Sequence, residues 1–251
     1  MLPRNLQRFK LVTFDCTNTL LYFKIPVHQQ YLKVAVEMGH KREDFDETKI
    51  FPSFKKHFKE SKVKFPNFGR RSIGFESWWS ELVQNVLSDS HRDKRKPEEF
   101  EKVANNLIKL YSTKECWNKY DGCDELIKSL KHHGKLIGII SNFDPRLHHL
   151  LRDMSLYKHF DFIITSYEAN FEKPDRKIFE LALDKSFGQK WNMIYPSESL
   201  HIGNEVETDY DGAINAGWSS VLIANNVQGN KNCFKSLREF YEAINLEEIE
   251  L

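Results

Sequence analysis

Short apolar runs that stop at polar residues recur along this sequence and predict buried β-strands. The first run, residues 11–14, is followed at once by Asp15 and by the polar turn residues Thr17, Asn18 and Thr19. An apolar run bounded by turn-forming residues is typical of a short, fully buried strand. Its last side chain would project from the carboxyl edge of a sheet, where open α/β folds bind their ligands.

After Leu21 the pattern changes from strand-like to helical. Apolar residues recur there at three- and four-residue spacing, which is typical of amphipathic helices. Helices are expected around residues 28–38, 45–58, 75–87 and 98–110, and no convincing strand lies between them. Residues 22–113 contain 18 Lys and Arg against 13 Asp and Glu, so this segment carries about +5. Most of that charge is expected on a solvated face.

From residue 121 onward, strand-like and helix-like segments alternate. Strands are expected at 136–140, 160–165, 200–202 and 220–224, and helices at 124–133, 146–154, after 173–175, at 209–216 and at 237–244. Such alternation implies right-handed crossovers and a parallel sheet. We therefore predict an α/β fold with a Rossmann-like parallel sheet core, formed by residues 1–21 and 114–251. An all-helical cap, residues 22–113, is inserted into it.

Composition narrows the class of protein. The chain has 251 residues, 40% of them hydrophobic and 29% charged, which is ordinary for a soluble globular protein. A net charge of +1 indicates neither nucleic acid nor membrane as a partner, and no apolar run approaches the roughly 20 residues that cross a bilayer. Four cysteines without a CxxC pair indicate free thiols in a reducing compartment. We expect a cytoplasmic protein that is a monomer or a weak dimer.

Four polar clusters fall at the ends of predicted strands or just before the next helix. They are Asp15 with Thr17 and Thr19, Ser141 with Asn142, Lys173, and Asn204 with Asp209. Each has a structural alternative: a helix cap for Asp15 or Asp209, a turn for Ser141, a surface charge for Lys173. In a parallel sheet the carboxyl ends share one edge, so the four clusters together predict one site. A carboxylate followed by hydroxyls two and four residues on suits a nucleophile that accepts a phosphoryl group.

The same clusters resemble the four motifs of the haloacid dehalogenase superfamily, over essentially the whole chain. The matching residues are Asp15, Thr17 and Thr19, then Ser141, then Lys173-Pro174-Asp175, and finally Gly203, Asn204 and Asp209. The helical insertion after the first motif resembles a type-one cap. The Trp78-Trp79 pair and residues 17–21 resemble one subgroup of the superfamily in particular.

This resemblance implies a role for each residue at the predicted sheet edge. Asp15 would attack phosphorus and form an aspartyl phosphate, in a small phosphorylated substrate. Lys173, Ser141 and Thr19 would hold the phosphoryl oxygens and offset their charge, with Asn142 also at the substrate.

The resemblance also implies a magnesium ion. Mg²⁺ prefers an octahedron of oxygen ligands. The Asp15 and Asp209 carboxylates and the Thr17 backbone carbonyl would supply them, together with water and, directly or through water, the amide oxygen of Asn204.

Two positions depart from the phosphatase pattern. Thr17 occupies the place of a second acid that protonates the leaving oxygen and later activates water, which a threonine cannot do near neutral pH. General acid–base catalysis contributes roughly 10²–10⁴-fold, so turnover is expected to be slow. Glu205, Glu207 or His28 could substitute. Asn204 replaces a usual carboxylate, which should lower the affinity for Mg²⁺.

These departures leave three functions open. The first is a Mg²⁺-dependent phosphatase-like hydrolase, and the second is a weakly active or inactive fold kept for binding. The third is a carbon–halogen hydrolase of the 2-haloacid dehalogenase type, a class that resembles this chain in lacking the second acid and needs no metal. That class uses an arginine to receive halide, a task that sequence cannot assign to Arg70 or Arg71.

Overall fold

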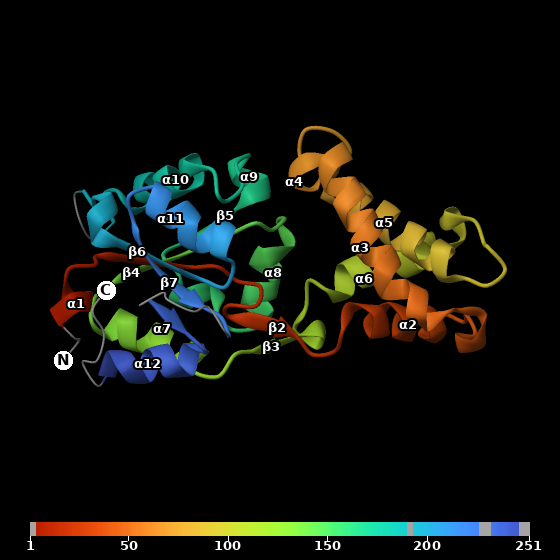
Figure 1. Ribbon diagram of the computed structural model, residues 1–251, viewed down its shortest axis with the longest axis horizontal. Helices are drawn as coiled ribbons and strands as arrows, with labels where there is room; N and C mark the ends of the chain where they lie inside the picture. The colour runs from red at the N-terminus through yellow and green to blue at the C-terminus, as the bar shows by residue number, and fades with distance from the viewer. Residues whose placement is uncertain (1–3, 190–192, 226–231, 246–251) are drawn as a thin grey trace. The chain divides into compact units, whose positions relative to one another are not determined.

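The computed structural model describes residues 4–189, 193–225 and 232–245. The chain divides into two units, one formed by Met1–Tyr22 with Asn118–Leu251 and the other by Phe23–Trp117 (Figure 1). The chain leaves the first unit along strand β2 (Leu21–Phe23) and returns along β3 (Trp117–Lys119), and these two strands form a two-stranded sheet that the sequence did not predict.

The first unit is built on a parallel sheet of six strands in the order β5-β4-β1-β6-β7-β8. Its strands are β1 (Leu11–Phe14), β4 (Leu136–Ser141), β5 (Phe162–Thr165), β6 (Ser199–Gly203), β7 (Ser219–Ile223) and β8 (Cys233–Phe234). The predicted α/β class with a parallel sheet is therefore confirmed, and the five strands expected from the sequence are all present. The two-residue strand β8 was not expected.

Helices cover both faces of this sheet. Figure 1 shows α10 and α11 on one face and α7 with α12 on the other. The helices of this unit are α1 (Arg4–Gln7), α7 (Cys123–His132), α8 (Arg146–Asp153), α9 (Ser166–Ala169), α10 (Arg176–Ser186), α11 (Gly212–Asn215) and α12 (Leu237–Asn245). The segment predicted as one helix over 209–216 differs, because a π-helical turn, η6 (Val206–Asp211), precedes α11.

Strand order brings distant segments together at one edge. Strand β1 lies between β4 and β6, with Phe14 beside Ile139 and Ile202. Asp15 continues the alignment, since its backbone N–H donates to the Ile202 carbonyl at 2.9 Å. All four residues of β1 are buried, as an apolar strand in the middle of a covered sheet should be. The ends of β1, β4 and β6 therefore meet.

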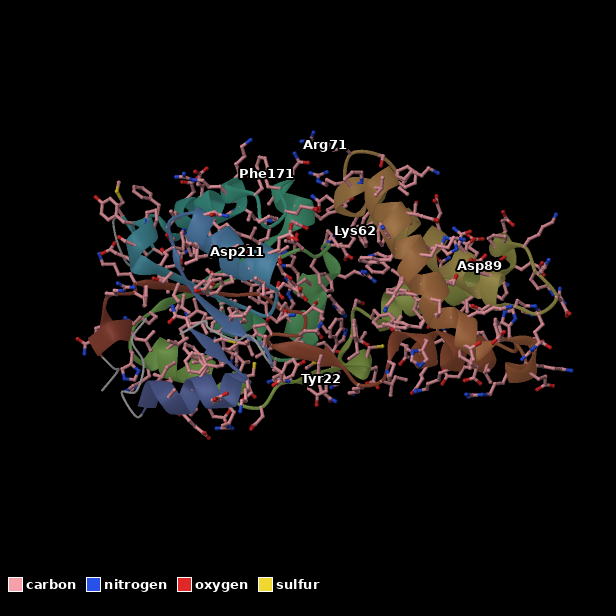
Figure 2. The ribbon with its side chains drawn as sticks, viewed as in Figure 1. Tyr22, Lys62, Arg71, Asp89, Phe171 and Asp211 are labelled. Atoms are coloured by element: carbon pink, nitrogen blue, oxygen red, sulfur yellow. The ribbon has the colours of Figure 1, made fainter. Side chains whose placement is uncertain are left out.

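The second unit is helical, as predicted for the insertion. Its helices are α2 (Val27–Glu37), α3 (Glu47–Lys64), α4 (Pro66–Gly69), α5 (Gly74–Ser90) and α6 (Glu101–Leu110), with short 3₁₀ turns at Arg42–Asp44, Pro97–Phe100 and Lys114–Cys116. Aromatic rings form much of its core: Trp78 is 1% exposed and meets Phe58 edge-on with ring centroids 5.5 Å apart. Figure 2 labels Lys62 at the end of α3 and Arg71 beyond α4, two of its many cations. Among the helices that the structure describes, none has the length and apolar character to span a bilayer.

Candidate active site

A tight turn after β1 forms the first wall of the site. The Cys16 carbonyl accepts hydrogen bonds from the backbone N–H groups of Leu20 and Leu21, each at 2.9 Å. Asn18 sits at the bend with φ of 60°, a left-handed conformation that asparagine tolerates better than most residues. This turn holds Asp15 at the end of the strand and reverses the chain into β2.

Asp15 has one anchored oxygen and one open oxygen. Its Oδ1 accepts hydrogen bonds from Ser141 Oγ at 3.0 Å and from Lys173 Nζ at 2.8 Å. No side chain of the described residues donates to Oδ2, and Asp15 is 8% exposed. Burial raises the pKa of Asp15 to about 6, although Lys173 and the Ser141 hydrogen bond oppose the rise. The carboxylate is thus fixed in orientation with one oxygen available to react.

Lys173 connects two carboxylates beneath the sheet edge. Its ammonium donates to Asp15 Oδ1 at 2.8 Å, to Asp209 Oδ1 at 2.5 Å and to the Ile140 carbonyl at 2.7 Å. These bonds use all three ammonium donors. Burial alone would lower the pKa of Lys173, but the two carboxylates raise it, so the lysine stays charged. The buried trio carries one negative charge in excess.

Asn142 fixes the backbone of Lys173. The Lys173 N–H donates to Asn142 Oδ1 at 2.7 Å, and Asn142 Nδ2 donates to the Lys173 carbonyl at 2.9 Å. The side-chain amide therefore pairs with a peptide group in the manner of two neighbouring strands. Asn142 positions Lys173 in this way, and the substrate contact expected of Asn142 stays a prediction.

Asp209 is held on both carboxylate oxygens. Its Oδ1 accepts a hydrogen bond from the Lys173 ammonium and lies 3.4 Å from His201 Nε2. Its Oδ2 accepts hydrogen bonds from the backbone N–H groups of Asn204 at 3.0 Å and Glu205 at 2.9 Å. Burial alone would raise its pKa, but the Lys173 ammonium holds the pKa of Asp209 below its usual range. These contacts make Asp209 the partner of Lys173, and the direct metal contact expected of it stays a prediction.

A short chain of side chains links the first and fourth motifs. The Thr19 hydroxyl donates to Asn204 Oδ1 at 3.1 Å, and Asn204 Nδ2 donates to Glu205 Oε1 at 3.0 Å. The Asn204 amide is therefore oriented with its oxygen toward Thr19. Thr17 lies in the turn, forming a single bridge with Leu21.

His201 belongs to this site although sequence reasoning missed it. It is 0% exposed in the middle of β6, and its Nδ1 lies 2.9 Å from Thr13 Oγ1. Burial lowers the pKa of His201 to about 4, so the ring is neutral. The available signal was a lone histidine inside an otherwise apolar strand, Leu200 to Gly203.

The oxygen atoms at this edge can bind a magnesium ion if water and substrate supply its remaining ligands. Mg²⁺ commonly binds through one or two carboxylates together with water and substrate phosphate. Asp15 Oδ2 meets that need because no described group donates to it, and the Asn204 amide oxygen is a second hard donor. Within the described part of the chain, no group of three or more His, Cys, Asp and Glu side chains could hold a metal ion. The residues thus fit an ion whose remaining ligands are water and substrate.

Three further groups of residues were considered from the sequence. Glu207 is exposed in η6. His28 on α2 and the two arginines after α4, Arg70 and Arg71, belong to the helical unit.

Comparison with known proteins identifies a matching family model and relatives of this chain. The family model for haloacid dehalogenase-like hydrolases matches residues 9–217. The rhythmically expressed gene 2 protein of Drosophila melanogaster is 37% identical over 227 residues, covering 88% of this chain and 85% of that protein. The haloacid dehalogenase-like hydrolase domain-containing protein 3 of Bos taurus is 31% identical, covering 86% and 82%. These relatives are the subgroup that the Trp78-Trp79 pair and residues 17–21 resemble, so that prediction is confirmed.

Solved structures share the fold. L-2-haloacid dehalogenase from Xanthobacter autotrophicus aligns with a TM-score of 0.67 at 18% identity, covering 94% of this chain and 98% of that one. The putative hydrolase YfnB from Bacillus subtilis, bound to magnesium, aligns with a TM-score of 0.65 at 16% identity, covering 95% and 99%. Both similarities concern the arrangement of helices and strands alone.

Proposed function

Because the chain belongs to the haloacid dehalogenase-like hydrolase family, we propose that it hydrolyses a small phosphorylated molecule through an aspartyl phosphate on Asp15. In this reaction Asp15 Oδ2 attacks phosphorus and the bond from phosphorus to the leaving oxygen breaks. Water then cleaves the acyl phosphate, which regenerates the carboxylate and releases phosphate.

The geometry of Asp15 is the observation that carries this proposal. Ser141 and Lys173 bind the same oxygen, Oδ1, at 3.0 and 2.8 Å. The negative charge of the other oxygen is therefore directed out of the cluster, ready for attack. As phosphorus is transferred, Ser141 and Lys173 remain next to the reacting centre, where donors and a positive charge offset developing charge.

Magnesium is part of the proposal. Asp15, the Asn204 side chain and the Thr17 backbone would hold the ion, and it would supply positive charge to the phosphoryl oxygens. Asp209 holds Lys173 beside Asp15, and its direct contact with the ion, implied by the resemblance, is kept as part of the proposal.

We propose that turnover is slow. Thr17, two residues after Asp15, occupies the position at which an acid would transfer the proton. A hydroxyl neither protonates a leaving oxygen nor deprotonates water at neutral pH. Glu205 contacts Asn204 and is an exposed carboxylate at the same edge, which makes it the substitute that the described contacts support best.

One observation favours a second function, carbon–halogen hydrolysis. The negative charge around Asp15 is low, because Thr17 and Asn204 are neutral and Asp209 is paired with Lys173. With little negative charge on its neighbours, Asp15 can attack carbon as well as phosphorus. A third outcome, a fold kept only for binding, would require that Asp15 forms no intermediate.

One experiment separates these functions. The protein is titrated with beryllofluoride and Mg²⁺, which together mimic an aspartyl phosphate, and then assayed on a panel of phosphorylated metabolites and 2-haloacids. Asp15→Asn should abolish beryllofluoride capture and turnover. Asp211→Asn, the same change at an exposed acid of the same unit (Figure 2), should alter neither. Absence of both beryllofluoride capture and turnover would support binding alone, and turnover only of haloacids would replace the phosphatase proposal.

A further inference from the structure

A buried row of polar residues runs across the sheet below the site. Thr13 on β1 is in register with His201 on β6, and His201 with Ser220 on β7. All three are 0% exposed. Buried polar groups destabilise a fold unless they are hydrogen-bonded, so the side chains of this row must satisfy one another or a neighbour.

Hydrogen bonding decides which nitrogen of His201 carries the proton. The Thr13 hydroxyl has one proton and two acceptors in reach, His201 Nδ1 at 2.9 Å and the Leu200 carbonyl at 3.5 Å. The shorter contact is the better hydrogen bond. If the hydroxyl donates to Nδ1, the neutral ring carries its proton on Nε2.

The Nε2 proton then faces the site. Nε2 lies 3.4 Å from Asp209 Oδ1, the long end of the hydrogen-bonding range. The opposite tautomer would place a nitrogen lone pair against a buried carboxylate oxygen, which is unfavourable in a medium of low dielectric. The Phe179 ring meets the imidazole edge-on, with ring centroids 5.5 Å apart, and limits the rotation of the imidazole.

We propose that His201 is a positioning residue of the active site: held by Thr13, it donates Nε2–H to Asp209 Oδ1 and thereby fixes the carboxylate that holds Lys173 against Asp15. The inference rests on the proposed function of Asp15. Without the imidazole, Lys173 is the one side chain of the described residues that still contacts Asp209 Oδ1, so the carboxylate can rotate about its Oδ2 contacts and hold Lys173 less firmly against Asp15.

The test uses the intact protein and three substitutions in the polar row. His201→Phe keeps a ring but removes both nitrogens, and His201→Gln keeps a donor that can reach Asp209. Ser220→Ala is the matched control, because among the described residues the Ser220 hydroxyl donates only to the His201 backbone carbonyl, at 3.3 Å. Nitrogen-15 NMR of the imidazoles reports the tautomer, the Lys173 ammonium signal reports its immobilisation, and kinetics on an aryl phosphate report kcat and KM.

We expect the wild-type His201 signal to show the proton on Nε2. His201→Phe should broaden the Lys173 ammonium signal and lower kcat about 10–100-fold, the range found when a side chain that orients a metal ligand is removed, with a smaller change in KM. His201→Gln should recover part of kcat, and Ser220→Ala should match the wild type.

A proton on Nδ1, or an unchanged Lys173 signal and kcat in His201→Phe, would overturn the proposal. If His201→Phe does not fold, the wild-type tautomer decides: a proton on Nε2 supports the proposal and a proton on Nδ1 overturns it. If the wild-type protein neither captures beryllofluoride nor turns over phosphate, the proposed function fails. The tautomer and the Lys173 signal, which need no turnover, then decide the role of His201 separately.

Discussion

Gly203 leaves room for Asp209 to lie directly against the end of strand β6. A β-carbon on Gly203 would overlap the Asp209 carboxylate carbon and its Oδ2. The same Oδ2 accepts the backbone N–H groups of Asn204 and Glu205. The absence of a side chain at position 203 is therefore what allows the carboxylate to reach these amides and, with its other oxygen, Lys173.

Gly203→Ala should accordingly displace Asp209. The overlap involves a buried carboxylate and is expected to cost about 1–3 kcal/mol of unfolding free energy, as overpacking usually does. Activity should fall sharply because Lys173 loses a partner. Chemical denaturation and aryl phosphatase kinetics measure the two effects. Gly188→Ala, where the new methyl meets nothing within 4 Å, should lose stability only through its positive φ and keep full activity. Normal kinetics in Gly203→Ala would contradict the role given to Asp209.

The pH dependence of activity should reflect Asp15. Burial raises its pKa to about 6, and only the ionised carboxylate attacks. Protonation increases as pH falls through that value, so kcat/KM should decline below about pH 6, by about tenfold per pH unit. A pH profile of kcat/KM in the free enzyme measures this midpoint.

A substitution tests the origin of that midpoint. The Ser141 hydrogen bond lowers the pKa of Asp15, so Ser141→Ala should move the acid limb to higher pH. Ser166→Ala, at the start of α9, is the control, because its hydroxyl donates to the Phe143 carbonyl at 3.4 Å. An acid limb near pH 4 would contradict the raised pKa of Asp15, and a limb that Ser141→Ala leaves in place would show that another group controls the profile.

Asn204→Asp should create a stronger magnesium site. Asn204 Nδ2 now donates to Glu205 Oε1 at 3.0 Å, and a carboxylate at 204 would place two negative charges side by side. We expect lower thermal stability without metal and tighter Mg²⁺ binding, because a hard cation relieves the repulsion. Calorimetric titration measures the affinity. The double variant with Glu205→Gln should lose the destabilisation while keeping much of the gain. Unchanged affinity would place residue 204 outside the reach of the metal.

Thr17→Asp should accelerate the hydrolysis of the aspartyl phosphate. A carboxylate at this position can accept a proton from the attacking water, which a threonine cannot do. The upper limit is about 3–5 kcal/mol of barrier, equivalent to roughly 10²–10⁴-fold. The gain should require bound Mg²⁺, since carboxylates at 15 and 17 repel each other. Thr17→Asn, similar in size but without an acid, is the control. Single-turnover kinetics with no faster phosphoenzyme decay in Thr17→Asp would show that proton transfer does not limit the rate.

The sequence predicted the sheet edge well because its signals are local. Residues 11–14 are an apolar run that ends at Asp15, and residues 136–140 are another that ends at Ser141. Each such strand needs only its own composition and its bounding polar residues to be recognised. Lys173 was identified from its place before a helix, and the structure joins it to Asp15 at 2.8 Å.

Other features depend on contacts that a linear pattern does not contain. His201 sits in an apolar strand, and its partner Thr13 is 188 residues away. The pairing of the Asn142 amide with the Lys173 backbone likewise joins residues far apart in the chain, and the substrate contact expected of Asn142 stays a prediction. The strands β2 and β3 have three residues each, too few to show an alternation of apolar and polar positions.

The central place of β1 has a consequence for the synthesis of the chain. Asp15 meets Ser141, 126 residues later, and Lys173, 158 residues later, while the strand β6 that flanks β1 begins only at Ser199. As the chain leaves the ribosome, the strand that ends in the nucleophile is made before β4, β5 and β6, and its second neighbour, β6, is the last of these to appear. The helical unit, Phe23–Trp117, emerges whole in the interval. A chain cut short before β6 would expose one side of β1 as an open edge, the kind of surface that aggregates and that chaperones bind.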